Sequence, residues 1–203
     1  MSIYDLGVLP YQELIQLIGD SDDATIIAGD ERHVKSASYD LRLGSDYYLY
    51  KEQKVDNSAT IKVTNLDETS SSTIIVPPHQ AVFVTIHERL NLPSDIVGHL
   101  SLKLDLTLKG LMMSAQSQID AGYKGQLFSL LFNLSDTDIT LQKGDEILRL
   151  ELSRMYTTSD KPYSGLISGK PLRDVLRKHL NSSNASLSQI VNNTKTAVDV
   201  KIR

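Results

Sequence analysis

Hydrophobic residues occupy every second position along residues 96–109, and polar residues fill most of the positions between them. Successive side chains of a strand point to opposite faces of the sheet, so this alternation predicts one continuous strand with an apolar face. Leu104 should then lie on the apolar face and Lys103 on the polar one. The apolar set consists of Ile96, Gly98, Leu100, Leu102, Leu104, Leu106 and Leu108.

Similar short hydrophobic runs recur from residue 38 to residue 155. Turn-forming residues such as Pro77 and Pro78 or Lys143 and Gly144 separate them, which is typical of an all-β sandwich or barrel. The predicted strands span residues 38–50, 59–63, 73–76, 80–90, 96–108, 125–134, 138–141 and 146–155.

The two ends of the chain follow a different pattern. Leu9, Leu14 and Leu17 have helical spacing around Pro10, which predicts a short N-terminal helix over residues 8–18. Further helical spacing follows residue 172. We therefore expect a β-domain over 1–156, a flexible arm over 157–171 and a basic, amphipathic C-terminal extension over 172–203.

Charge also sets the C-terminal segment apart. The whole chain has a formal net charge of −4, which argues against broad nucleic-acid binding, yet residues 170–203 carry seven Lys or Arg and two Asp. Two interpretations stay open for residues 172–203. They form either an amphipathic tail that docks on the protein's own oligomer or a helix that binds a protein partner.

The 203 residues include no cysteine. This excludes disulfides, thiolate zinc sites, iron–sulfur ligation and a cysteine nucleophile, and the Cys-x-x-Cys of zinc-type deaminases cannot occur. The histidines show no metal-ligand spacing, so we expect neither zinc nor another protein-held metal. Neither a signal-like N-terminus nor an apolar run long enough for a membrane span is found, which predicts a cytoplasmic protein without membrane contact.

Two places carry candidate chemistry. Lys103 lies in the polar row of residues 97–109, which is either a solvated sheet face or a surface where Lys103 meets an anion at a subunit junction. Asp120 begins the turn Asp-Ala-Gly-Tyr-Lys-Gly, three residues before Tyr123. This carboxylate could orient a water or a sugar hydroxyl beneath the aromatic ring, although turn chemistry alone would also favour Asp and Gly here.

The ordered motifs of the chain resemble those of the dCTP deaminase and trimeric dUTPase superfamily. The resemblance runs from about residue 9 to residue 155. Residues 160–171 are similar to the mobile arm that closes over the nucleotide in deaminases of this family. The motifs are Ser38-Tyr39-Asp40-Leu41-Arg42-Leu43-Gly44, Glu88-Arg89-Leu90-Asn91-Leu92-Pro93 with Ile96-Val97-Gly98, Ile119-Asp120-Ala121-Gly122-Tyr123-Lys124-Gly125, Leu131-Phe132-Asn133, and Ile139-Thr140-Leu141 leading to Gly144 and Ile147.

This resemblance implies a distorted β-barrel that forms a homotrimer, with active sites built by neighbouring subunits. The deaminases use a glutamate, a serine and an arginine without a metal at the base, whereas the dUTPases use an aspartate to orient water while Mg²⁺ organises the triphosphate. Asp120 is accordingly the expected catalytic residue, and Mg²⁺ would accompany a bound deoxynucleoside triphosphate. The expected nucleotide-binding residues are Asp40, Arg42, Lys103, Gln118 and Tyr123.

Four positions depart from the deaminase pattern. Leu130 stands where the family has its catalytic glutamate, Leu104 and Asp105 stand where it has two serines, and Leu108 stands where it has an arginine. Leucine cannot transfer a proton, and the loss of a general acid or base typically costs about 10²–10⁴ in rate. Asp105 adds a negative charge near the expected triphosphate, a repulsion of about a few kcal/mol at an effective dielectric constant near 20.

Two functions therefore stay open. The first is a deoxypyrimidine nucleotide-handling protein that resembles dCTP deaminase, which converts dCTP to dUTP, or dUTP diphosphatase, with ordinary deamination not expected. The second is a catalytically inactive trimeric regulator or scaffold that binds nucleotide and engages a partner through residues 172–203.

Overall fold

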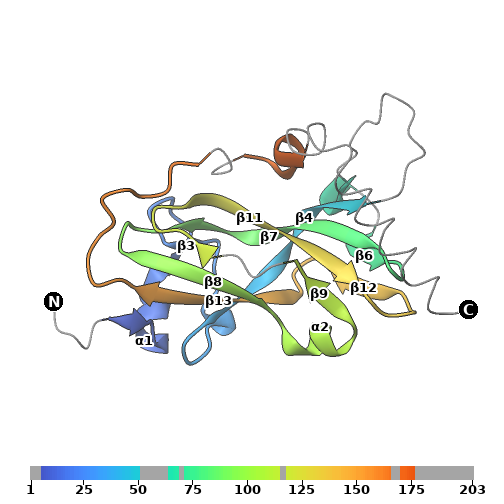
Figure 1. Cartoon of the computed structure of the whole chain (residues 1–203), viewed down its shortest axis with the longest axis horizontal. Coiled ribbons are helices and arrows are strands. Elements are labelled where there is room, and N and C mark those ends of the chain that lie inside the picture. The colour runs from blue at the N-terminus through green and yellow to red at the C-terminus, as the bar shows by residue number, and fades with distance from the viewer. Residues whose placement is uncertain (1–5, 51–63, 69–70, 115–117, 166–169, 177–203) are drawn as a thin grey trace, which may run out of the picture.

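The computed structural model describes residues 6–50, 64–68, 71–114, 118–165 and 170–176, and most of its regular structure is β-strand (Figure 1). The labelled α-helices are α1 (Tyr11–Leu14) and α2 (Leu104–Leu108), residues 172–176 are also helical, and 3-10 turns lie at Ile15–Leu17, Glu31–His33 and Leu66–Glu68. The strands are β1 (Gly7–Val8), β2 (Ile18–Gly19), β3 (Ile26–Ile27), β4 (Tyr39–Tyr50), β5 (Thr64–Asn65), β6 (Thr73–Val76), β7 (Ala81–Asn91), β8 (Ile96–Leu102), β9 (Leu111–Met113), β10 (Gln118–Ile119), β11 (Lys124–Asn133), β12 (Ile139–Gln142) and β13 (Glu146–Arg154).

One large sheet runs in the order β10-β8-β13-β4-β7-β11-β9, and β12 pairs with β6 in a second, small sheet. Strand β4 joins the two halves of the large sheet, because its first residues pair with β13 and its later ones with β7. Gly44 lies between these halves, where a Cβ would come within 2.7 Å of the Thr85 hydroxyl oxygen. The missing side chain at Gly44 lets β4 pass close to β7. The predicted all-β fold is confirmed.

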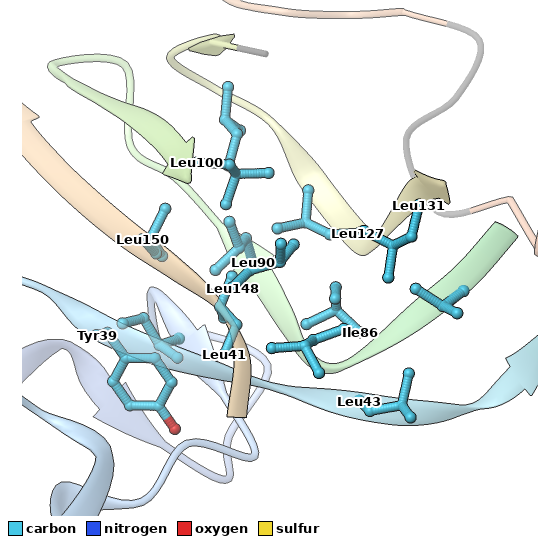
Figure 2. Packing of buried hydrophobic residues seen from close by; sticks show 14 of the residues in the cluster. Tyr39, Leu41, Leu43, Ile86, Leu90, Leu100, Leu127, Leu131, Leu148 and Leu150 are labelled. Carbon is cyan, nitrogen blue, oxygen red and sulfur yellow. The ribbon is translucent and has the colours of Figure 1, made fainter. Parts of the chain in front are cut away.

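Alternating residues of the long strands build the hydrophobic core, part of which Figure 2 shows. In β11, for example, every second residue from Gly125 to Asn133 is buried. Leu41, Leu148 and Leu131 have no exposed surface. Burial of such side chains stabilises the fold by about 1.5–3 kcal/mol each, and it places the intervening residues of β11 on the opposite face of the sheet.

The predicted N-terminal helix is present but short. It begins after Pro10 as α1 and continues as the 3-10 turn Ile15–Leu17. Leu9 and Leu14 are buried, and the Leu9 amide donates to the Leu152 carbonyl at 2.8 Å. This segment therefore packs on β13.

The expected strand over residues 96–109 is wrong in its second half. Strand β8 ends at Leu102, and α2 follows at once. Leu106 is buried at 5% exposure, whereas Leu104 and Leu108 are 72% and 78% exposed. Residues four apart share one face of a helix and the residue midway between them points away. Three alternating leucines fit either structure, and the sequence pattern could not distinguish them.

The remaining predicted strands and the C-terminal segment can be compared with the structure where it describes them. The strands expected at 38–50, 73–76, 80–90, 125–134, 138–141 and 146–155 are found within a few residues, while 59–63 lies outside the described residues. Residues 172–176 are helical and bury Leu172, Val175 and Leu176, and residues 177–203 lie outside the described part. The proposed domain boundaries stay a prediction.

In the described part of the chain, no helix combines the length and the apolar run needed to cross a membrane.

Candidate functional site

The turn that carries Asp120 connects β10 to β11. The Tyr123 amide donates to the Asp120 carbonyl at 3.1 Å, and Gly122 has a φ of +84°. This left-handed conformation favours glycine. A side chain at Gly122 would also come within 2.7 Å of Pro162. The turn is thus built for close contact with the segment around Pro162.

A cavity of about 340 Å³ lies beside this turn, and we call it the Leu130 hollow. Its walls are mainly apolar, and Asp120 is the only carboxylate among the described residues that line it. The Gln118 amide nitrogen donates to the Asp120 carboxylate at 3.0 Å, which orients that group at the exposed rim. The lining residues are Phe83, Leu100, Met113, Ser114, Gln118, Ile119, Asp120, Tyr123, Leu127, Phe128, Ser129, Leu130 and Tyr163.

Tyr123 is nearly buried, at 7% exposure. Its hydroxyl donates to the Gln126 carbonyl at 2.8 Å, and its ring lies against that of Tyr163, with centroids 5.6 Å apart. Burial, followed by the charge of Tyr163, raises the pKa of Tyr123 to about 12. Tyr123 therefore offers a neutral aromatic surface at physiological pH, and its hydroxyl is already engaged.

Lys103 and Asp40 form an ion pair in the structure. The Lys103 ammonium contacts the Asp40 carboxylate and lies 2.9 Å from a Glu146 oxygen. Asp40 is fully buried, and the Arg149 Nε donates to it at 3.1 Å. Burial would lower the pKa of Lys103, but its hydrogen bonds to Asp40 and Glu146 raise it above the ordinary value. The positive charge of Lys103 is thus used to balance two carboxylates of its own chain, Asp40 and Glu146.

Arg42 belongs to a separate network, although it lies two residues from Asp40. Its Nε donates to the buried Glu88 carboxylate at 2.6 Å, and its NH2 group donates to the Ala28 carbonyl at 2.7 Å. The Tyr39 hydroxyl donates to the same Glu88 at 3.1 Å. Arg42 therefore braces β4 against β7 and the Ala28 segment.

The structure groups the sequence-predicted site residues in three places. Gln118, Asp120 and Tyr123 lie at the Leu130 hollow, Asp40 pairs with Lys103, and Arg42 pairs with Glu88. No sequence pattern pointed to Tyr163 or Arg149, and none gave Glu88 or Glu146 a role. Glu88 occupies a position of β7 that is buried, like the apolar residues on the same face of the strand. The alternating pattern could therefore have indicated a buried carboxylate that needs a cationic partner.

Comparison with known proteins decides the family. The dCTP deaminase-like family model matches residues 8–155. The chain belongs to the dCTP deaminase-like family. It is similar to the dCTP deaminase of Thermococcus kodakarensis, at 30% identity over 68% of this chain and 81% of that protein. It is also similar to the dUMP-forming dCTP deaminase of Aquifex aeolicus, at 31% identity over 68% of this chain and 77% of that protein.

A solved structure supports the fold of this dCTP deaminase-like chain. The crystal structure of 2′-deoxycytidine 5′-triphosphate deaminase from Agrobacterium tumefaciens matches with a TM-score of 0.59 at 18% identity, over 74% of this chain. This chain spans 47% of the length of that protein. At this identity the match shows the shared architecture of the dCTP deaminase-like fold.

The described residues of this dCTP deaminase-like chain contain no group of three or more His, Cys, Asp or Glu side chains that could hold a metal ion. The buried Asp40 carboxylate is instead surrounded by Lys103, Arg149 and, at 3.5 Å, Lys35. Three cations around one carboxylate disfavour a further divalent cation there.

Proposed function

We propose that this dCTP deaminase-like protein binds deoxypyrimidine nucleotides at the Leu130 hollow and does not deaminate them by proton transfer at position 130. The observation that carries the proposal is Leu130 itself, which lines the hollow where the family resemblance places a glutamate. Asp120 is the only carboxylate among the described lining residues, and it lies at the rim.

Asp120, Gln118 and Tyr123 give the hollow its polar side. The Asp120 carboxylate, held by Gln118, accepts a hydrogen bond from a sugar hydroxyl, and the Tyr123 ring packs against the sugar. If the protein hydrolyses triphosphates, Asp120 is the group that orients the attacking water. Leu130 and Phe128 supply an apolar wall for the base.

Asp40, Arg42 and Lys103 support this site from a distance in our proposal. The positive charge of Lys103 balances the charge of the buried Asp40 carboxylate, and the positive charge of Arg42 balances that of Glu88. Arg149, whose side chain is 48% exposed, is the cation of the Asp40 cluster best placed to meet a phosphate group. Any Mg²⁺ would enter with the triphosphate, and we take the assembly to be a cytoplasmic homotrimer.

The test is a nucleotide assay on the full chain. Purified protein is incubated with dCTP and dUTP, with and without Mg²⁺, while ammonia and pyrophosphate are followed, and binding is measured by calorimetry. We expect heat of binding without ammonia release, and weaker binding in Asp120→Ala. Asp136→Ala, an exposed aspartate outside the hollow, is the matched control. Ammonia release from dCTP would overturn the proposal.

The second candidate is an inactive regulator or scaffold. The burial of Leu172, Val175 and Leu176 favours it, because the C-terminal extension begins with apolar side chains that are packed away from solvent. Nucleotide binding without any product, together with capture of a partner that a chain truncated after residue 176 does not capture, would support this function. Pyrophosphate release that depends on Asp120 would contradict it.

A further inference from the structure

A second cavity, larger than the Leu130 hollow, lies beside the turn of Asp120. Four segments form its walls: the loop before β3, the connection from β7 to β8, the turn of Asp120 and residues 162–165. We call it the arm cavity. Its volume of about 630 Å³ lies within the range of small-molecule sites in proteins. Among the described residues, Tyr163 is the one that lines both cavities, and the proposed function leaves the arm cavity without a role.

Three polar residues lie side by side along one wall of the arm cavity. Asn91 at the end of β7 pairs in register with Lys124 of β11, and its backbone amide donates to the Thr25 carbonyl at 3.0 Å. The Asn91 side-chain amide donates to the Asp22 carbonyl at 3.1 Å, which holds this side chain in place. The side chains of residues paired across antiparallel strands begin about 4.5–5.5 Å apart. Thr25, Asn91 and Lys124 can therefore contact one small ligand together.

The charges of the arm cavity balance each other. Among the described residues that line it, Asp23 carries the negative charge and Lys124 the positive charge. A phosphate group would be attracted by Lys124 and repelled by Asp23, so a nucleoside triphosphate gains little here. Ser94 and Ser164 add hydroxyl groups, which both donate and accept hydrogen bonds. This set of groups fits an uncharged ligand that carries several hydroxyls.

Rings of proline and tyrosine complete the walls. The Gly122 amide donates to the Pro93 carbonyl at 3.1 Å, and a Cβ at Gly122 would come within 2.7 Å of Pro162. Gly165 lies so close to the ring of Tyr163 that a side chain at Gly165 would collide with it. Such rings present flat apolar area that packs against the carbon face of a sugar or a base. A few polar groups among apolar rings are typical of a ligand site.

We propose that the arm cavity binds an uncharged ring compound with several hydroxyl groups, either a free sugar or a nucleoside. The hydroxyls bond to Asp23, Asn91 and Ser164, while the ring packs on Tyr163. A ligand there restrains residues 162–165 and thereby holds Tyr163 at the Leu130 hollow. Because each ligand stabilises the same position of Tyr163, the two bind cooperatively. The site itself is independent of the proposed function, whereas this coupling rests on it.

The first test is binding of adenosine to the full chain by equilibrium dialysis, with ribose as competitor. We expect adenosine to bind. Displacement by ribose would identify the sugar as the recognised group, and binding that ribose does not displace would identify the nucleoside. Absence of adenosine and ribose binding would overturn the proposal. Asp120→Ala should leave adenosine binding unchanged, and a loss in that variant would place adenosine in the Leu130 hollow and overturn the proposal as well.

The second test changes the walls of the arm cavity. The double variant Asp23→Ala/Ser164→Ala should bind adenosine at least tenfold more weakly. Its matched control is Asp20→Ala/Ser21→Ala, which removes the same chemical groups outside the cavity. All four side chains are exposed, so both variants should fold, which circular dichroism checks. Unchanged binding in the first variant, or an equal loss in the control, would contradict the assignment of the site.

The third test measures the coupling. The Kd of dCTP, obtained by calorimetry on the full chain, should fall at least threefold when adenosine is saturating. In Tyr163→Ala adenosine should no longer change it. A dCTP affinity that adenosine leaves unchanged in the wild type would overturn the coupling. Absence of dCTP binding would contradict the proposed function instead, and the adenosine measurements would still decide the arm cavity.

Discussion

The ring of Tyr163 packs on the ring of Tyr123, so the segment that follows β13 is held against the turn of Asp120. The Tyr163 amide reinforces this contact by donating to the Ala121 carbonyl at 2.8 Å. The close approach of Pro162 to Gly122 belongs to the same contact. The residues around Tyr163 therefore form part of the candidate site.

Removal of the Tyr163 ring should change the titration of Tyr123. Burial and the charge of Tyr163 raise the pKa of Tyr123 to about 12, so Tyr163→Ala is expected to move it down towards the ordinary value of 10.0. Tyr163→Phe keeps the ring and should retain most of the elevation. Ring-labelled tyrosine followed by NMR over alkaline pH measures both. An unchanged pKa in Tyr163→Ala would show that Tyr163 does not shield Tyr123.

Stability measurements distinguish helix α2 from a continued strand. Leu106→Ala should destabilise the protein by about 2–5 kcal/mol, because it leaves a cavity in the core. Leu108→Ala should change stability by less than about 0.5 kcal/mol, since that side chain is exposed. Urea unfolding of dilute protein gives both values. Equal losses would indicate that the two leucines share one buried face, as in a strand.

The sequence predicts some segments of this fold and not others, and the reason in each case is physical. Strands β4, β7, β11 and β13 were predicted because one buried face imposes a two-residue repeat. The repeat fails at α2, where alternating leucines fit two structures. At the site, the turn chemistry of Asp120 was visible in the sequence. The pairing of Lys103, which follows β8, with Asp40 of β4 joins segments far apart in the chain, and no local pattern encodes it.

The Glu146 carboxylate should make stability depend on acid pH. Burial alone would raise its pKa, but hydrogen bonds from His33 and Lys103 and the charges of Lys103 and Lys35 lower it to about 2, from an ordinary value of 4.5. The folded state therefore binds this proton less readily than the unfolded state. Its contribution is present above pH 4.5 and is lost as the pH falls towards 2.

Glu146→Gln should accordingly flatten the acid limb of the stability curve. The free energy of unfolding, measured in urea between pH 2 and pH 6, should fall less steeply than in the wild type. Glu151→Gln is a matched control, because Glu151 lies exposed on the same strand. Parallel curves for wild type and Glu146→Gln would exclude Glu146 as a source of the pH dependence.

The buried pair of Glu88 and Arg42 should be the most sensitive electrostatic position of the fold. Glu88 has no exposed surface, and its two oxygens accept from the Arg42 amide at 2.9 Å and from the Arg42 Nε at 2.6 Å. In Glu88→Gln, the charge that compensates Arg42 disappears, and one amide N–H group must face a donor. Breaking a buried ion pair from one side costs about 3–5 kcal/mol.

Urea unfolding of Glu88→Gln should therefore show a loss within that range, whereas Glu31→Gln, which changes an exposed partner of the Tyr11 hydroxyl, should lose less than about 1 kcal/mol. The double variant Glu88→Gln/Arg42→Met removes the uncompensated charge and should recover part of the loss. If Glu88→Gln were as stable as Glu31→Gln, the ion pair would contribute nothing to holding β4 against β7, and the bracing role of Arg42 would have to be abandoned.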